Sequence, residues 1–117
     1  MFNLFKPFNI SLHRVHDKVR ITEGGESLEL HVDADPMRMV AGLSQAQKML
    51  QALTSDSTEE ESLNAAKYFA QVIFGKEQAD NLVGFYHNDA GCVINVCGRY
   101  FEKRLSKLIM AAQKKIK

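Results

Sequence analysis

The first third of the chain alternates between apolar and polar residues. Apolar side chains occupy every second position, with polar side chains between them, in residues 8–12, 18–22 and 27–32. Alternation with a period of two is typical of β-strands that bury one face. Between the second and third stretches, Gly24 and Gly25 can adopt the positive φ values of a tight turn. The pattern predicts a β-hairpin or small sheet within residues 8–32, with residues 18–32 as the hairpin.

From Asp33 onward the apolar residues recur about every 3.6 positions, which indicates amphipathic α-helices. Asp35 is a good N-cap and Pro36 suits a first helical position, so a helix is expected to begin there. Ser57 followed by Glu60 matches a capping box for the next helix. The spacing of the apolar residues predicts four helices, at residues 36–53, 57–74, 76–86 and 89–114.

These elements predict an α+β fold that is mainly α. An N-terminal β-hairpin or small sheet within residues 8–32 is followed by a compact four-helix part over residues 33–117. With 117 residues, of which 45% are hydrophobic and 25% charged, the chain suits one globular domain over residues 1–117. We expect residues 1–7 to be frayed. Six large apolar residues on the helical stripes are expected to be largely buried: Leu63, Phe69, Ile73, Leu82, Phe101 and Leu105.

The net charge of +1 conceals a strong separation of charge along the chain. Residues 56–90 carry seven acidic and two basic side chains, whereas residues 91–117 carry seven basic and one acidic. Two interpretations are open: the two segments offset each other within the fold or across a self-association contact, or the basic segment docks an acidic partner. On the last predicted helix, the candidate partner-binding residues fall within one arc: Arg99, Lys103, Lys107 and Lys114.

The residues that usually carry chemistry do not form a recognisable catalytic or metal-binding motif. Cys92 and Cys97 lack CxxC spacing and are expected to be reduced thiols packed as small hydrophobes. Only His13 and His16, beside Asp17, could form a weak adventitious metal site. The glycines do not form a phosphate-binding loop. We therefore expect no enzyme activity, no cofactor, no stoichiometric metal and only weak, non-specific DNA binding.

A cytoplasmic location is expected, since no apolar run approaches the ~18 residues that a membrane span needs. The first ten residues are also too short and aromatic for a signal peptide.

Most of the chain from about Asp33 resembles the small tail assembly chaperones of long-tailed (siphovirus-like) bacteriophages and prophages. The resemblance rests on the segments YFAQVIFGKEQADNLVGFY, HNDAGCVINVCGRYFEKRLSKLI and AAQKK. Within them the family pattern is matched by Phe74-Gly75, Tyr86, Asp89, Tyr100 and Arg104. The resemblance implies a β-rich N-terminal portion, a helical bundle and a final Lys-rich helix.

The family resemblance also implies a function. Such a protein acts in the host cytoplasm as a non-structural helper that coats the tape measure protein, keeps its long hydrophobic helices soluble and helps to recruit tail tube subunits. It is absent from the mature virion and often has a longer, frameshifted form; no such extension is visible after AAQKKIK. Self-association is also expected, because a hairpin edge without proline can add a strand from another copy.

Two other functions remain open from the sequence. One is a small nucleic-acid-binding regulator whose C-terminal helix meets phosphates. The basic residues available for this are Arg99, Lys103, Lys107, Lys114, Lys115 and Lys117. The other is a structural tail or head-completion subunit that stays in the virion.

Overall fold

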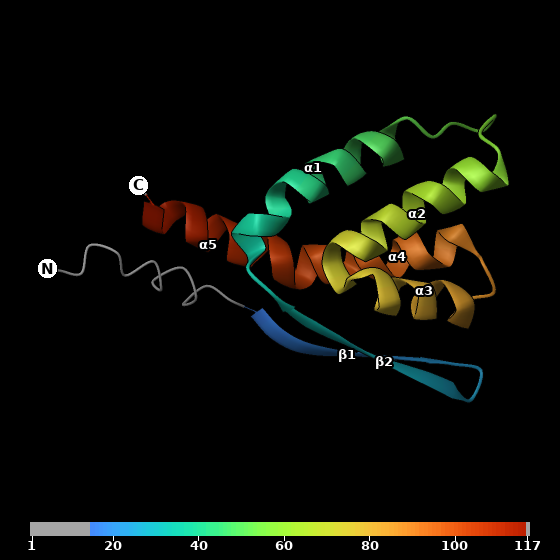
Figure 1. Cartoon of the computed structure of the whole chain (residues 1–117), viewed down its shortest axis with the longest axis horizontal. Coiled ribbons are helices and arrows are strands. Elements are labelled where there is room, and N and C mark those ends of the chain that lie inside the picture. The colour runs from blue at the N-terminus through green and yellow to red at the C-terminus, as the bar shows by residue number, and fades with distance from the viewer. Residues whose placement is uncertain (1–14, 117) are drawn as a thin grey trace, which may run out of the picture.

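The structure, a computed structural model, describes residues 15–116 and the side chains of residues 15–111. A two-stranded antiparallel hairpin is followed by helices (Figure 1), which confirms the predicted α+β, mainly α fold. The predicted strand at residues 8–12 and the predicted frayed end lie outside the described residues. The elements are β1 Val15–Glu23, β2 Glu26–Ala34, α1 Pro36–Gln51, α2 Glu59–Phe74, α3 Lys76–Phe85, α4 Ala90–Tyr100, the π-helical turn η3 Phe101–Leu105 and α5 Ser106–Ile116.

The hairpin forms around the two predicted turn glycines. Gly24 and Gly25 have φ values of 57° and 86°, so both residues occupy the left-handed region that a two-residue hairpin turn requires. The strands extend beyond the predicted limits, to Val15 on one side and Ala34 on the other, which are register partners. One face of the ribbon is mainly apolar and lies against the helices, and the opposite face is polar and exposed.

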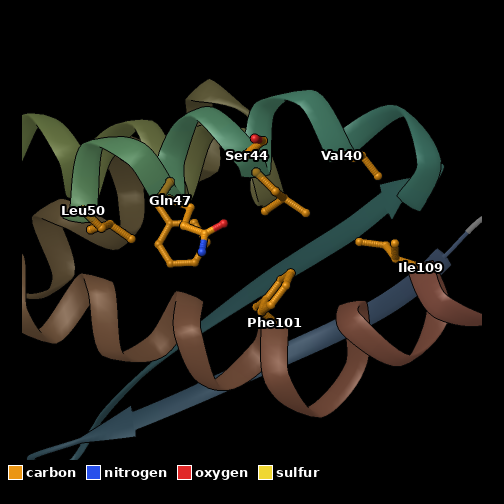
Figure 2. A pocket seen from close by; sticks show the side chains of 8 residues that line it. Val40, Ser44, Gln47, Leu50, Phe101 and Ile109 are labelled. Carbon is orange, nitrogen blue, oxygen red and sulfur yellow. The ribbon is translucent and has the colours of Figure 1, made fainter. Parts of the chain in front are cut away.

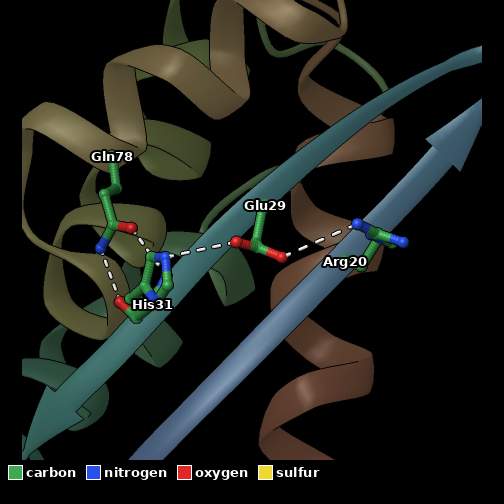
Figure 3. Close-up of polar contacts among 4 residues, drawn as sticks. All are labelled: Arg20, Glu29, His31 and Gln78. Atoms are coloured by element: carbon green, nitrogen blue, oxygen red, sulfur yellow. Dashed lines mark hydrogen bonds and ion pairs between the residues drawn. The ribbon is translucent and has the colours of Figure 1, made fainter.

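Gln78 of α3 fastens the outer edge of β2 to the helical part (Figure 3). The backbone N–H of His31 donates to Gln78 Oε1 at 2.7 Å, and Gln78 Nε2 donates to the carbonyl oxygens of His31 at 2.6 Å and Phe74 at 2.7 Å. One amide therefore satisfies the outward-facing backbone groups of His31. On the exposed face, Glu29 lies 3.9 Å from Arg20 and 3.6 Å from His31, and such exposed ion pairs stabilise little.

The outer edge of β1 is open within the described part of the chain. Among residues 15–116 no hydrogen bond reaches it. Its exposed side chains include Lys18 and Arg20. Charged residues on an edge strand discourage the addition of further strands.

One of the two predicted helix caps is confirmed, and the other differs. Asp35 accepts a hydrogen bond from the Met37 N–H at 3.0 Å, with Pro36 as the first helical residue, as predicted. The capping box of α2, however, is formed by Thr58 and Glu61, with reciprocal bonds of 3.0 and 2.8 Å. The predicted pair beginning at Ser57 is wrong because the Ser57 hydroxyl accepts from the Thr54 N–H within the preceding turn.

The last helix is continuous but irregular. It begins after Asp89, which accepts from the Cys92 N–H at 3.2 Å, and it extends to Ile116. The π-helical turn Phe101–Leu105 interrupts its α-helical pattern and was not predicted. Since this turn inserts an extra residue into the repeat, side chains after it are rotated relative to those before it.

Helix α2 lies at the centre of the fold and contacts α1, α3, α4 and β2. It approaches α1 closely at Gly42, where an added Cβ would lie 3.0 Å from both Cγ atoms of Val72.

No helix in the described part of the chain is both long and apolar enough to cross a membrane. Four of the six residues predicted to be core are confirmed as buried: Phe69, Ile73, Leu82 and Leu105.

The other two predicted core residues, Leu63 and Phe101, are only partly buried. Both pack against the core from its margin. Phe101 lies in the π-helical turn, where its ring lines an open groove rather than the closed interior. Helical periodicity identified their faces correctly, but it carries no information on how closely the neighbouring helix covers them.

Candidate functional site

An apolar groove runs between α1 and the last helix (Figure 2). Its volume is about 460 Å³. The α1 wall extends from Val40 to Leu50, while Phe101 and Ile109 form the opposite wall. Phe69 of α2 also lines the groove. Ile109 lies at the Val40 end of the groove, and Phe101 lies near its middle.

The packing of α1 explains why the groove stays open. Helix α1 is held against α2 by the close approach at Gly42, and it contacts the last helix through α5. Away from these contacts, the facing surfaces of α1 and the last helix do not pack against each other, and the groove lies between them. Phe101, which would otherwise fill a closed interface, is consequently half-exposed.

The lining of the groove is mostly apolar, so it suits an apolar ligand surface. Only Ser44 and Gln47 contribute polar side chains, and both are exposed. None of the lining residues among those described is ionisable, so these residues supply no general acid, general base or metal ligand. The apolar lining residues are Val40, Leu43, Leu50, Phe69, Phe101 and Ile109.

The predicted partner-binding residues lie on the last helix, on three successive segments. Arg99 is in the last turn of α4, Lys103 is in the π-helical turn and Lys107 is in the first turn of α5, and all three are exposed. The side chain of Lys114 lies outside the described residues. The structure thus shows three accessible basic residues on the helix that forms one wall of the groove, although none of them lines it.

A polar cluster that sequence reasoning missed ties β1 to the last helix. The Asp17 carboxylate accepts hydrogen bonds from the Tyr100 hydroxyl at 2.7 Å and from Arg104 Nε and Nη2 at 2.7 and 3.1 Å. Arg104 holds the pKa of Asp17 below its usual value of 3.8, with a further contribution from Tyr100 and against the opposing effect of burial. Burial, followed by the bond to Asp17, raises the pKa of Tyr100. The cluster is structural, because it fixes the hairpin against the helix.

One signal in the sequence could have revealed this cluster. Asp17 occupies an inward position in the alternation of β1, between Val15 and Val19. A carboxylate on the buried face of a strand needs a partner. Its partner could not be identified from the sequence, since Arg104 is 87 residues away.

Replacing Asp17 by Asn should lower the free energy of unfolding at neutral pH by roughly 1–2 kcal/mol, because it removes a charged hydrogen-bond acceptor. Since the pKa of Asp17 is depressed in the folded state, its contribution is present above pH 3.8 and is lost as the pH falls through the folded value. Denaturant titrations at pH 7 and pH 3 should show the deficit shrinking in acid. Asp56→Asn, an exposed change in the α1–α2 connection, serves as the control, and an equal deficit at both pH values would contradict this role.

The other residues of the family pattern also have structural positions. Gly75, with a φ of 87°, joins α2 directly to α3, and Asp89 caps α4. Phe74 packs against Tyr100 with ring centroids 5.9 Å apart. These residues therefore act at a helix junction, at a helix N-terminus and between packed helices, and none of them lines the groove.

The cysteines and histidines do not assemble into a further site in the described part of the chain. Burial raises the pKa of the Cys97 thiol to about 12, and Cys92, also a free thiol, is half-buried with a raised pKa. Among residues 15–116, no three potential metal ligands lie close enough to hold an ion. His13, one member of the weak metal site considered above, lies outside the described residues.

Comparisons with known proteins give no family assignment: no family model matches the chain, and neither the curated proteins nor the solved structures contain a significant match.

Proposed function

We propose that this chain is a tail assembly chaperone of long-tailed bacteriophages, which binds the tape measure protein and keeps it soluble during tail morphogenesis. The observation that carries this proposal is the open apolar groove between α1 and the last helix. Grooves of this kind accept the apolar stripe of an amphipathic helix. The sequence resemblance supplies the identity of the partner, which the groove alone does not specify.

The dimensions of the groove suit a short length of helix. From Val40 to Leu50 the α1 wall is about 15 Å long, given a rise of about 1.5 Å per residue, and this length corresponds to about three turns of a bound helix. Burying one Leu or Phe side chain of the partner would contribute about 1.5–3 kcal/mol. A long tape measure protein presents many such stripes, so several copies of the chain could cover it in succession.

Self-association remains part of the proposal, but the hairpin edge limits how it can occur. Gln78 occupies the outer edge of β2 at His31, so β1 is the less obstructed edge for strand addition within the described residues. A two-fold pairing of β1 centred on Val19 would place Lys18 opposite Arg20 of the second copy, and like charges directly opposite each other are destabilising. Contact between copies is therefore expected to depend on the oppositely charged segments 56–90 and 91–117.

Co-expression tests the proposed function. A tape measure fragment expressed alone should be insoluble, and this chain should bring it into solution and co-purify with it in several copies. If the fragment stays insoluble, the chaperone proposal fails. If the chain is found on finished tails, it is a structural tail or head-completion subunit instead.

One observation favours the nucleic-acid alternative enough to require a control. Arg99, Lys103 and Lys107 are exposed, and none of them forms an ion pair with another described residue. Free basic residues along a helix bind phosphates in a salt-dependent way. A sequence-specific DNA complex that survives high salt would establish a regulator in place of a chaperone.

A further inference from the structure

The groove has opposite charges at its two ends. At the Leu50 end, the chain turns into the α1–α2 connection and the first turn of α2, which we call the acidic end: Asp56, Glu59, Glu60 and Glu61, all exposed. Lys48 in the last turn of α1 and Arg99 of α4, on the Leu50 side of Phe101, are nearby, but the four carboxylates outnumber them. At the Ile109 end lies the basic part of the last helix, which we call the basic end and define by Lys103 and Lys107.

No ion pair joins these two ends in the part of the chain whose side chains are described. The ion pairs of residues 15–111 join Asp17 to Arg104, Arg38 to Asp35, and residues of the hairpin to one another. None of them connects the acidic segment 56–90 with the last helix. The first interpretation of the charge separation, that the segments offset each other within one fold, therefore lacks the ion pairs it needs in the described part of the chain.

Charges that flank the groove can act on a helix bound in it. A helix with its side chains is about 10–12 Å across, which is comparable to the Debye length of about 10 Å at 0.1 M salt. Lys103 and Lys107, which lie on one wall helix but do not line the groove, therefore remain only partly screened there. The acidic end follows Leu50 along the chain, so its charge acts where a bound helix leaves the groove. The α1 wall adds Arg38 and Lys48 and has no acidic residue.

We propose that the groove binds an amphipathic helix in one direction, with the acidic half of that helix at the basic end and its basic half at the acidic end. This inference rests on the proposed function, in which the groove holds a helix. It adds the charge pattern of the bound segment and its orientation. A nucleic acid does not fit the same surface, because phosphates would be repelled at the acidic end and bases would have few polar partners in the lining.

Binding of two synthetic peptides to the purified chain tests this inference. Both are amphipathic helices of about 14 residues with identical apolar stripes. In the bipolar peptide, Glu occupies the polar face of one half and Lys that of the other. In the mixed peptide, the same numbers of Glu and Lys alternate along the polar face. The bipolar peptide should bind about tenfold more tightly at low salt, and the difference should disappear at 0.5 M salt.

Orientation is measured with a photo-crosslinker placed at either end of the bipolar peptide. Crosslinks from its Glu end should map to residues 103–116, and those from its Lys end to residues 50–62. In the chain, Glu59→Lys with Glu60→Lys should abolish the preference for the bipolar peptide. The matched change Glu77→Lys with Asp80→Lys, on α3 away from the groove, should leave it intact.

The outcomes separate this inference from the proposed function. Equal binding of both peptides in the groove, or crosslinks that map equally to both ends, would overturn the directional binding and leave a groove that binds helices. A failure of both peptides to bind, together with a failed co-expression test, would instead remove the proposed function itself.

Discussion

A chain that carries Val40→Glu and Ile109→Glu should lose most of its ability to solubilise the tape measure protein. The two residues face each other across one end of the groove, and neither belongs to the buried core. A carboxylate that is buried against an apolar helix without a hydrogen-bond partner has a large desolvation cost. The amount of tape measure fragment that co-purifies should therefore fall by roughly tenfold or more. Pull-down of the tape measure fragment after co-expression measures the loss.

The control for this experiment is Ala41→Glu, which adds one carboxylate to an exposed position of the same helix, α1. It should co-purify with the fragment as well as the unchanged chain does. Circular dichroism and thermal melting should show that both variants fold. If the double variant still solubilises the fragment normally, the groove is not the binding surface.

Leu105→Ala should destabilise the fold far more than Phe101→Ala does. Leu105 is fully buried, with 0% of its surface exposed, and its truncation should lower the free energy of unfolding by about 2–5 kcal/mol. Phe101 is only half-buried in the groove wall, so its truncation should cost roughly 1–2 kcal/mol, below the ~3–5 kcal/mol of a core phenylalanine. Denaturant titration of the two variants gives the comparison.

This pair of variants also tests whether the groove is open in solution. A loss above about 3 kcal/mol for Phe101→Ala would mean that its ring is enclosed as a core residue. Phe101→Ala should in addition weaken binding of the tape measure fragment directly. Leu105→Ala should weaken binding only to the extent that it unfolds the chain. A normal affinity in a folded Phe101→Ala chain would contradict the role of this ring in the groove.

The sequence determined most of the secondary structure because the signals for it are local. The alternation of β1 and β2, the two glycines of the turn and the cap at Asp35 each act within a few residues, and all were confirmed. The capping box of α2 was misplaced by one residue. Two neighbouring hydroxyls, those of Ser57 and Thr58, could each serve as the cap, and the hydrogen bond from the Thr54 N–H decides between them.

The tertiary structure decided the features that join distant parts of the chain. The Asp17 cluster spans 87 residues and the Gln78 contact with His31 spans 47, and no local pattern specifies such partners. The same holds for the groove. Helical spacing showed which side of each helix is apolar, but the approach of α1 to α2 at Gly42 and the π-helical turn at Phe101 determine how much of that surface stays uncovered. The sequence by itself therefore determined the elements and their apolar faces, whereas the site depends on distances between helices, which only their packing in three dimensions sets.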